Sequence, residues 1–557
     1  MKKILPFLLL QLLVGLLPAQ VSFLKEINPS PTAGSLVARQ TPFVHGNLMY
    51  FLADDGTNGA EIWRTDATTA GTSLLKNIVP GNEGIKSVHY SALGSDVILA
   101  VASASGFAIW KTDGTPDGTT LVKNIYTGSD AEDWAGRIAG ADGFVCFAAN
   151  DGVNGPELWR TDGTAAGTKM IKNISPFASS FPQFLTAWNG KILFYHDNST
   201  NGYELWVSDG TEGGTALVKD INPGANSSNS FPAEFNLVAT PLGVFFNPND
   251  GVNGRELWIS DGTPAGTRLV KNINPANDTP GAFLSGNPAE YQETAFFKDK
   301  FYFNGFDDAN GKELWATDGT TAGTALVKDA APGAAWMTLY RTVTTADRLF
   351  FIGETFIDDF QLYVTDGTAA GTQQLKYIDA PGFYDGPDVT SPMVSYVNRA
   401  WFAGRTFGFG SELWKSDGTT AGSAMAADIN FGPADGSPKH PTVLGDRIIF
   451  YAISPNSGHE LYSYIDPAVS TQAPDATAAQ LTVSPNPAGQ QFSVETNLPF
   501  DGPARVQLIS TSGYLSGHWE MTAPKQSFPC EHIPAGLYLL RIINSSGVNL
   551  NSKIIIH

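Results

Sequence analysis

Short runs of alternating apolar and polar residues, separated by turns rich in Gly, Asn and Asp, fill most of the chain. Between residues 183 and 221, QFLTAW and KILFYHD are joined by Asn189-Gly190, and YELWVS and TALVKDI are joined by Asp-Gly-Thr-Glu-Gly-Gly. A period of two residues is typical of β-strands, and Asn-Gly between two such runs is typical of a tight hairpin. The pattern predicts four antiparallel strands that follow one another as a meander.

This four-strand pattern recurs with an aromatic residue at a fixed place in its third strand. Copies of that strand and its turn read ELWRTDGTAAGT from Glu157, ELWISDGTPAGT from Glu256 and ELWATDGTTAGT from Glu313. Successive aromatic residues are 47 to 57 positions apart, a period that indicates a repeat architecture. The aromatic positions are Trp63, Trp110, Trp159, Trp206, Trp258, Trp315, Tyr363, Trp414 and Tyr462.

These copies resemble the ELWxxDGT repeat family of secreted bacterial proteins, and the resemblance covers most of residues 21–466. The motif is long and is present nine times, so a chance match is excluded in practice. The resemblance implies a repeated structural unit. It implies little about activity, because the family is defined by the repeat and not by a reaction.

The two ends of the repeat region each hold part of a unit. VSFLKEINP, from Val21, is the last strand of a unit, and HELYSYIDP, from His459, is a unit without its last strand. An open solenoid would end in polar caps, whereas complementary ends let the first strand complete the last unit of a ring. We therefore expect a closed β-propeller of about nine four-stranded blades with N-terminal strand closure.

The composition changes after this region. Residues 467–480 are small, polar and Pro-containing, which is typical of a linker, and residues 481–557 contain alternating segments that predict a small immunoglobulin-like β-sandwich. This last part resembles the C-terminal sorting domain of the type IX secretion system of Bacteroidetes. The matching residues are Pro485, Asn486 and Pro487 near its start, Gly536 and Tyr538 in IPAGLYLLRI, and Lys553 in the closing strand. The resemblance implies the type IX secretion machinery as a partner, and removal of the domain after export. An ordinary adhesive sandwich is the alternative.

The N-terminal segment MKKILPFLLLQLLVGLLPAQ has two lysines, an apolar run and a small residue before Gln20, the layout of a secretory signal peptide. No later apolar run reaches the 18 residues of a transmembrane helix. The predicted organisation is a signal peptide at 1–19, an ELWxxDGT-repeat β-propeller at 20–466, a linker at 467–480 and the sorting domain at 481–557. The predicted location is secreted or on the outer-membrane cell surface.

Composition and charge narrow the function classes. Of the 557 residues only 16% are charged, and 58 Gly and 35 Pro suit turn-rich β structure. A net charge of -20 argues against nucleic-acid binding, because the phosphate backbone would be repelled. Cys146 and Cys530, in different predicted domains, do not form a disulfide framework.

Most repeated residues have a structural interpretation. The seven tryptophans of the motif are expected in the core, and Asp209 and Gly210 are expected to form the turn after the third strand. Counting back from that turn places Glu204 opposite Lys219 as an exposed cross-strand ion pair, which contributes about 0.2 to 1 kcal/mol. The same offset of 15 joins Glu61 to Lys76, Glu157 to Lys172, Glu256 to Lys271 and Glu313 to Lys328.

A second repeated feature is an acidic loop between the second and third strands. It reads DDGTNG from Asp54, NDGVNG from Asn150, DNSTNG from Asp197, NDGVNG from Asn249 and DDANG from Asp307. Such oxygen-rich loops suit Ca²⁺. Asp-Gly and Asn-Gly are also common hairpin turns, so a bound Ca²⁺ and a plain turn both stay open. No other cofactor is predicted.

No catalytic motif is present in the sequence: it contains no Gly-x-Ser-x-Gly, His-Glu-x-x-His or phosphate-binding loop. The loops that vary most, led by Asn274–Thr294, lie on one face of the predicted ring, and loop variation on a rigid scaffold is typical of binding. The leading hypothesis is a binding or adhesion module for glycan or protein. The alternatives are a secreted polysaccharide-active enzyme, a glycosidase or lyase with acids at the pore, and a passive spacer in a surface layer.

Overall fold

The structure is a computed structural model. It describes residues 21–30, 34–37, 40–128, 138–175, 182–225, 227–228, 237–275, 281–283, 293–332, 336–355, 360–376, 391–406, 409–430, 433–454, 457–466, 481–484, 488–496, 503–510, 515–543 and 549–556. The proposed signal peptide, the linker, Pro485, Asn486 and Pro487 lie outside the described residues, as does most of the 274–294 loop.

Every regular element among the described residues is a strand, and the strands form antiparallel sheets. The all-β class and the four-stranded meander predicted from the sequence are confirmed. Within the same ranges there is no helix with the length and apolar character needed to span a bilayer.

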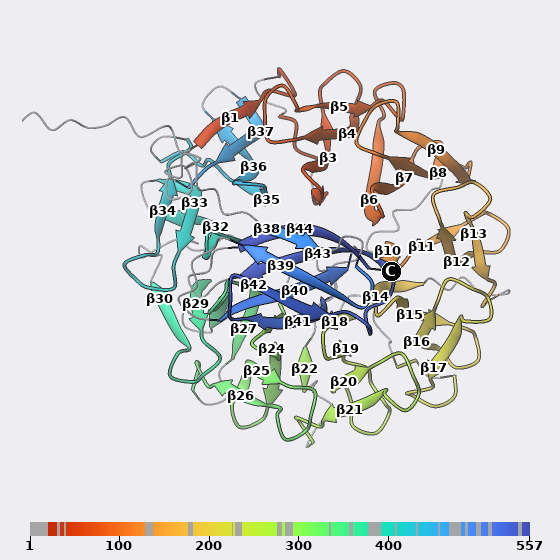
Figure 1. The fold of residues 1–557 in the computed structure, drawn as a ribbon, viewed down its shortest axis with the longest axis vertical. Coiled ribbons are helices and arrows are strands. Elements are labelled where there is room, and N and C mark those ends of the chain that lie inside the picture. Colours follow the sequence, from red (N-terminus) through yellow and green to blue (C-terminus); the bar gives the residue numbers. More distant parts are fainter. Residues whose placement is uncertain are drawn as a thin grey trace, which may run out of the picture.

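The described part of residues 21–464 forms nine sheets, arranged around a ring in Figure 1. Eight of them follow one another along the chain: β2 (Phe43–His45), β3 (Leu48–Asp54), β4 (Ala60–Thr65), β5 (Ser73–Lys76); β6 (Ile85–Leu93), β7 (Asp96–Ser103), β8 (Gly106–Thr112), β9 (Thr120–Tyr126); β10 (Ile138–Ala141), β11 (Phe144–Asn150), β12 (Pro156–Thr161), β13 (Lys169–Lys172); β14 (Gln183–Trp188), β15 (Lys191–Asp197), β16 (Tyr203–Ser208), β17 (Ala216–Lys219); β18 (Val238–Thr240), β19 (Gly243–Phe246), β20 (Leu257–Ser260), β21 (Arg268–Lys271); β22 (Ala282–Phe283) and β23 (Ala295–Phe297) beside β24 (Lys300–Asp307), then β25 (Gly311–Thr317), β26 (Ala325–Lys328); β27 (Met337–Thr344), β28 (Leu349–Thr355), β29 (Gln361–Thr365), β30 (Gln373–Lys376); and β31 (Val394–Tyr396), β32 (Arg399–Thr406), β33 (Gly410–Ser416), β34 (Ala424–Ala427).

The ninth sheet joins the two ends of the repeat region. It contains β35 (Lys439–Leu444), β36 (Arg447–Ser454) and β37 (Ser457–Tyr464), with β1 (Val21–Lys25) as its fourth strand. Phe23 of β1 lies opposite Tyr462, and their rings meet edge to face at 5.3 Å between centroids. The first strand therefore completes the last sheet, as the complementary ends of the sequence predict.

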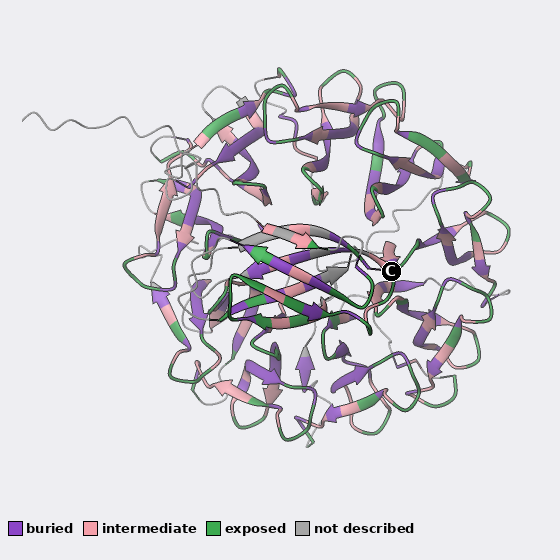
Figure 2. Ribbon diagram, in the orientation of Figure 1, coloured by how far each residue is buried: buried purple, intermediate pink, exposed green. Residues whose placement is uncertain are grey.

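The core of the ring consists of clusters between neighbouring sheets. On one side of β15, Ile192 and Phe194 pack with residues of β11. On the other side, Leu193 and Tyr195 pack with residues of β19. A second strand covered on both faces can be apolar throughout, which explains why KILFYHD alternates so weakly. Figure 2 shows this burial along the strands and exposure in the connecting turns.

The C-terminal region forms two further sheets. One contains β38 (Leu481–Ser484), β39 (Gln491–Thr496) and β42 (Lys525–Pro529), and the other contains β41 (Leu515–Met521), β40 (Ala504–Ser510), β43 (Gly536–Ile543) and β44 (Asn549–Ile556). Phe492, Val506 and Leu540 belong to one buried cluster that draws on both sheets. This region therefore has a core of its own, separate from the clusters of the ring.

Candidate functional site

The turn after the third strand is built by its own side chains. Asp209 Oδ1 accepts hydrogen bonds from the amide of Thr211 at 2.9 Å and from its hydroxyl at 2.7 Å. These bonds lower the pKa of Asp209, the Thr211 hydroxyl being the main cause. Ser208 and Thr215 join their hydroxyls at 2.7 Å across the turn, and Gly210 has a φ of 82°. Asp209 and Gly210 thus have structural roles in this turn.

The predicted pair of Glu204 and Lys219 is wrong. A bulge between Leu205 and Trp206 shifts the register, so that Lys219 lies opposite Leu205. Glu204 is fully buried, and its carboxylate accepts the amides of Ile221 at 3.0 Å and Asn222 at 3.2 Å. The glutamate therefore does not form an exposed ion pair. Its hydrogen bonds link the third strand to the backbone that follows the fourth strand.

The same arrangement is present in other sheets. Each glutamate accepts the two backbone amides that lie 17 and 18 positions ahead of it, and at the ring closure Glu460 accepts the amides of Ile27 and Asn28. The other described members are Glu61, Glu157, Glu256 and Glu313. Burial raises the pKa of Glu61 and Glu460. It raises the pKa to about 7 in Glu204, Glu256 and Glu313, and also in Glu412, whose carboxylate accepts the amide of Ile429.

The lysine of the repeat links one sheet to the next. Lys219 Nζ donates to the carbonyl oxygen of Thr267 at 2.8 Å and lies 5.6 Å from the ring centroid of Trp258, both in the following sheet. The same hydrogen bond joins Lys76 to Thr119, Lys123 to Thr168, Lys172 to Thr215, Lys271 to Thr324 and Lys328 to Thr372. The lysine is therefore an inter-sheet contact, and its partner lies 43 to 53 positions away.

The motif tryptophans lie in these inter-sheet contacts. Trp110 is half-buried. The other six are at most 8% exposed: Trp63, Trp159, Trp206, Trp258, Trp315 and Trp414. Six of the seven are therefore core residues, and Trp110 packs at the edge of a core cluster.

Replacing Lys271 by Met tests the inter-sheet role. The variant keeps the aliphatic stem against Trp315 and loses the hydrogen bond to Thr324 and the cation above the indole. We expect a loss of about 1 to 2 kcal/mol, measured as a lower urea midpoint. Lys300→Met, at an exposed position of β24, is the matched control. Equal midpoints for the two variants would contradict the role.

In the acidic loops, the aspartate carboxylates accept hydrogen bonds from residues of the same loop. Asp55 Oδ1 accepts the amides of Thr57 at 2.9 Å and Asn58 at 2.8 Å, and its Oδ2 accepts the Asn58 side chain at 2.8 Å. Asp151 and Asp250 repeat this pattern. Within the described ranges no group of three or more His, Cys, Asp or Glu residues is spaced to hold a metal ion. The three loops are therefore turns in which the aspartate is bonded to the amides of its own loop.

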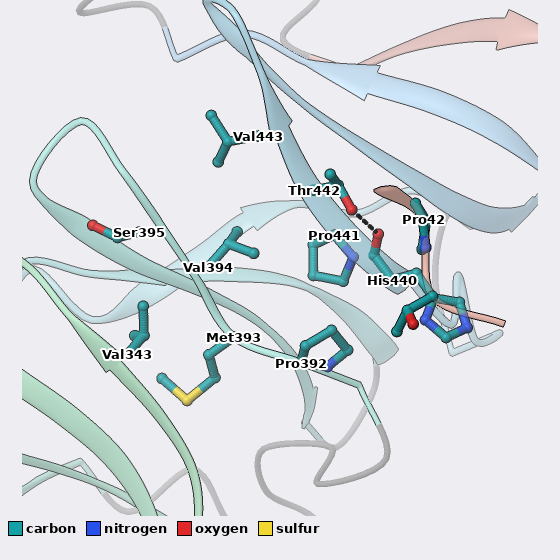
Figure 3. Close-up of a pocket in the computed structure, with 11 residues that line it drawn as sticks. Pro42, Val343, Pro392, Met393, Val394, Ser395, His440, Pro441, Thr442 and Val443 are labelled. Carbon is teal, nitrogen blue, oxygen red and sulfur yellow. Dashed lines mark hydrogen bonds between the residues drawn. The ribbon is translucent and has the colours of Figure 1, made fainter. Parts of the chain in front are cut away.

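A cavity of about 430 Å³ lies at the inner side of the ring (Figure 3). Its walls come from β27, β31 and β35, the first strands of three consecutive sheets, and from the segment just before β2, the first strand of the next sheet. β27 and β35 lie at the inner side of the ring in Figure 1. The lining residues are Thr41, Pro42, Val343, Pro392, Met393, Val394, Ser395, His440, Pro441, Thr442 and Val443. The cavity is therefore apolar with a few hydroxyls and one imidazole.

His440 is the one ionisable group of this lining. Burial, together with the nearby charges of Lys439 and Arg341 and the His459 imidazole, lowers the pKa of His440 to about 4. The Thr442 hydroxyl donates to the His440 carbonyl oxygen at 3.0 Å, within a segment where His440 has a φ of 50°. The imidazole is neutral at pH 7, so the cavity offers hydrogen bonding without charge.

The described residues of the predicted sorting motif lie on β43 and β44, the last two strands of the C-terminal region. Gly536 begins β43 opposite Ile556, and Lys553 of β44 lies opposite Leu539. Tyr538 is buried, and its hydroxyl donates to the carbonyl oxygen of Pro534 at 2.7 Å. Gly536 and Lys553 thus occupy paired backbone positions of β43 and β44.

Comparisons with known proteins find similar solved structures but no matching family. No protein-family model and no curated protein matches the sequence. The chain is similar to PorZ, an essential bacterial surface component of the type-IX secretion system of Porphyromonas gingivalis, at 12% identity and a TM-score of 0.31, covering 93% of this chain and 75% of PorZ. It is similar to the β-propeller domain of the Trilobed protease from Pyrococcus furiosus at 12% identity and a TM-score of 0.29, covering 61% and 98%. One of two prolyl endopeptidases gives 10% identity and a TM-score of 0.36, covering 66% and 55%.

Proposed function

We propose that residues 20–466 form a closed nine-bladed β-propeller that acts as a binding module for a glycan or protein. The observation that carries this proposal is the use of the repeated side chains. The tryptophans, the turn aspartates, the buried glutamates and the lysines all serve contacts within or between sheets. Recognition is therefore left to residues that do not repeat, in the inner cavity and in the loops, held by a rigid ring.

We also propose that the chain is an exported member of the ELWxxDGT repeat family. In this proposal residues 1–19 are a signal peptide, and residues 481–557 are an immunoglobulin-like sorting domain for the type IX secretion machinery. The support is the order of Pro485, Asn486, Pro487, Gly536, Tyr538 and Lys553 in the sequence, on a two-sheet domain with its own core. The mature protein is then secreted or held at the outer-membrane surface.

Binding is favoured over catalysis at the inner cavity. A glycosidase needs two carboxyl groups about 5 to 10 Å apart around the scissile bond. The eleven residues that line the cavity include no Asp or Glu. The buried glutamates of the sheets are bonded to backbone amides and do not line it.

The test is a parallel binding and hydrolysis screen of residues 20–557, the chain without its proposed signal peptide. We expect retention of some glycans or outer-membrane proteins on arrays, with no product released from the same polysaccharides. Release of shortened sugars would contradict a pure binding role. Retention of neither class of ligand would contradict the binding module itself.

A further inference from the structure

Seven Asn-Gly dipeptides occur in the sequence, and the structure holds their asparagine side chains differently. In such a dipeptide the backbone nitrogen of the glycine can attack the side-chain carbonyl carbon of the asparagine, because glycine has no Cβ to obstruct the approach. The attack requires an asparagine side chain that can turn toward this nitrogen. The dipeptides are Asn58-Gly59, Asn154-Gly155, Asn189-Gly190, Asn201-Gly202, Asn253-Gly254, Asn304-Gly305 and Asn310-Gly311.

Five of these asparagines end the loops between second and third strands, and aspartate carboxylates hold them there. Asn58 Nδ2 donates to Asp55 Oδ2 at 2.8 Å, and Asn58 Oδ1 accepts the side-chain amide of Asn77 at 2.9 Å. A side chain bonded in this way must break these hydrogen bonds before it can rotate. The same donation to an aspartate holds Asn154, Asn201, Asn253 and Asn310.

The two asparagines outside these loops have opposite surroundings. Asn304 is fully buried within β24, where its Nδ2 donates to the carbonyl oxygen of Leu339 at 3.2 Å and its Oδ1 accepts the Leu339 amide at 3.0 Å. Asn189 is exposed in the turn between β14 and β15. Asn189 and Gly190 have φ values of 50° and 74°, as in a two-residue hairpin turn. Within the described part of the chain no hydrogen bond involves the Asn189 side-chain amide.

We propose that Asn189 is a site of spontaneous deamidation in the folded chain, a modification that does not depend on the proposed binding function. The backbone nitrogen of Gly190 forms a bond to Cγ of Asn189, and the Cγ–Nδ2 bond breaks. The proton of the glycine amide leaves with Nδ2 as ammonia, and a five-membered imide is left in the backbone. Water then opens the imide at either carbonyl, which gives aspartate or isoaspartate. One water is consumed and one ammonia is released, so no oxidant or other reactant is needed.

The product places a second carboxylate beside an existing one. Asp142 Oδ2 lies 3.5 Å from the point that a Cβ on Gly190 would occupy, so the neighbouring turn between β10 and β11 already brings a negative charge to this hairpin. A carboxylate at position 189 therefore adds repulsion between like charges. Isoaspartate also adds one carbon atom to the backbone of a two-residue turn. We expect the modified chain to elute later in anion exchange and to melt slightly lower than the unmodified chain.

The experiment incubates folded residues 20–557 at pH 8 and compares the seven sites by digestion and peptide mass spectrometry. We expect Asn189 to convert at least about tenfold faster than the other six asparagines, because each of these must first break its hydrogen bonds. In the same chain unfolded in urea, all seven sites should convert at similar rates, since they share one dipeptide. Asn189→Ser should remove the species that elutes later in anion exchange.

A second variant tests the reason for the selectivity. Asp250→Ala removes the acceptor of Asn253 Nδ2, and Asn253 should then convert several-fold faster. Asn154 is the matched control, because it ends the identical loop NDGVNG and keeps its own aspartate. An unchanged rate at Asn253 in this variant would contradict the hydrogen-bond explanation on which the choice of Asn189 rests. Conversion of Asn189 in the folded chain at no more than the rate of Asn58 or Asn304 would overturn the proposal.

Discussion

A chain that lacks residues 20–28 is expected to melt about 5 to 10 °C below the intact mature protein and to self-associate. The deletion removes β1, with the buried Leu24 and Ile27, and both amides that Glu460 accepts. Two buried aliphatic side chains are worth about 1.5 to 3 kcal/mol each, and a carboxylate left buried without donors adds to the loss. A cost of this size lowers the melting temperature of a ring this large by several degrees. The bare edge of β37 is then free to pair with another chain.

Point variants separate ring closure from the mere length of the chain. Leu24→Asp places a charge in the cluster that β1 shares with β3 and should reproduce most of the effect. Ser22→Asp, at an exposed position of the same strand, should change the melting temperature little. Calorimetry and size-exclusion chromatography give both readouts. A deleted chain that stays monomeric and melts at the wild-type temperature would show that β1 does not hold the ring together.

The elements of this fold are readable from sequence because the signals are local. Period-two alternation and Asn-Gly or Asp-Gly turns predict each hairpin, and β14 to β17 match the four runs seen between residues 183 and 221. β1 and β37 pair although they lie at opposite ends of the repeat region in sequence. This pairing is also predictable, because the two ends complement each other in sequence.

The roles of the repeated charges were not predictable in the same way. Register counted from the turn assumes one residue opposite one residue, and the bulge beside Trp206 breaks that assumption. The lysine contacts join successive sheets, so no single hairpin contains both partners. One sequence signal did exist: the seventh unit has Gln361 in place of the glutamate. In the structure the Gln361 side chain is only 1% exposed. An uncharged isostere suits a buried hydrogen-bonding position better than an exposed ion pair.

The repeat pattern alone does not identify the candidate binding residues. His440 lies in a first strand whose pattern matches that of β14, where Phe184 occupies the equivalent position with a similar positive φ, so the backbone position recurs but the imidazole does not. Sequence could indicate only the face on which variable loops lie.

The mature protein is expected to melt on the order of 5 to 10 °C higher at pH 5 than at pH 8. Burial raises the pKa of six glutamates, Glu61, Glu204, Glu256, Glu313, Glu412 and Glu460, above the usual 4.5, and to about 7 in four of them. Between these pH values the folded chain binds more protons than the unfolded chain. The stability that these glutamates contribute is therefore fully present below pH 4.5 and is lost as the pH rises through 7.

Other groups set the acid limit of this trend. The turn aspartates, such as Asp209, have a lowered pKa, so their contribution is lost as pH falls below about 4. Burial lowers the pKa of His440 to about 4, so this group opposes the glutamates between pH 6.5 and 4, and the lowered pKa of His459 acts in the same direction below pH 6.5. Two imidazoles act against six carboxyl groups, so maximum stability is expected near pH 5.

Amide variants identify the groups responsible. Glutamine mimics the protonated carboxyl group, and Gln361 shows that the fold accepts it. The triple variant Glu204→Gln, Glu256→Gln, Glu313→Gln should melt close to wild type at pH 5 and lose about half of the difference between pH 5 and pH 8. The matched variant Asp209→Asn should keep that difference, because its carboxyl group titrates at lower pH. A wild-type melting temperature that rises from pH 5 to pH 8 would contradict a raised pKa of these glutamates in the folded ring.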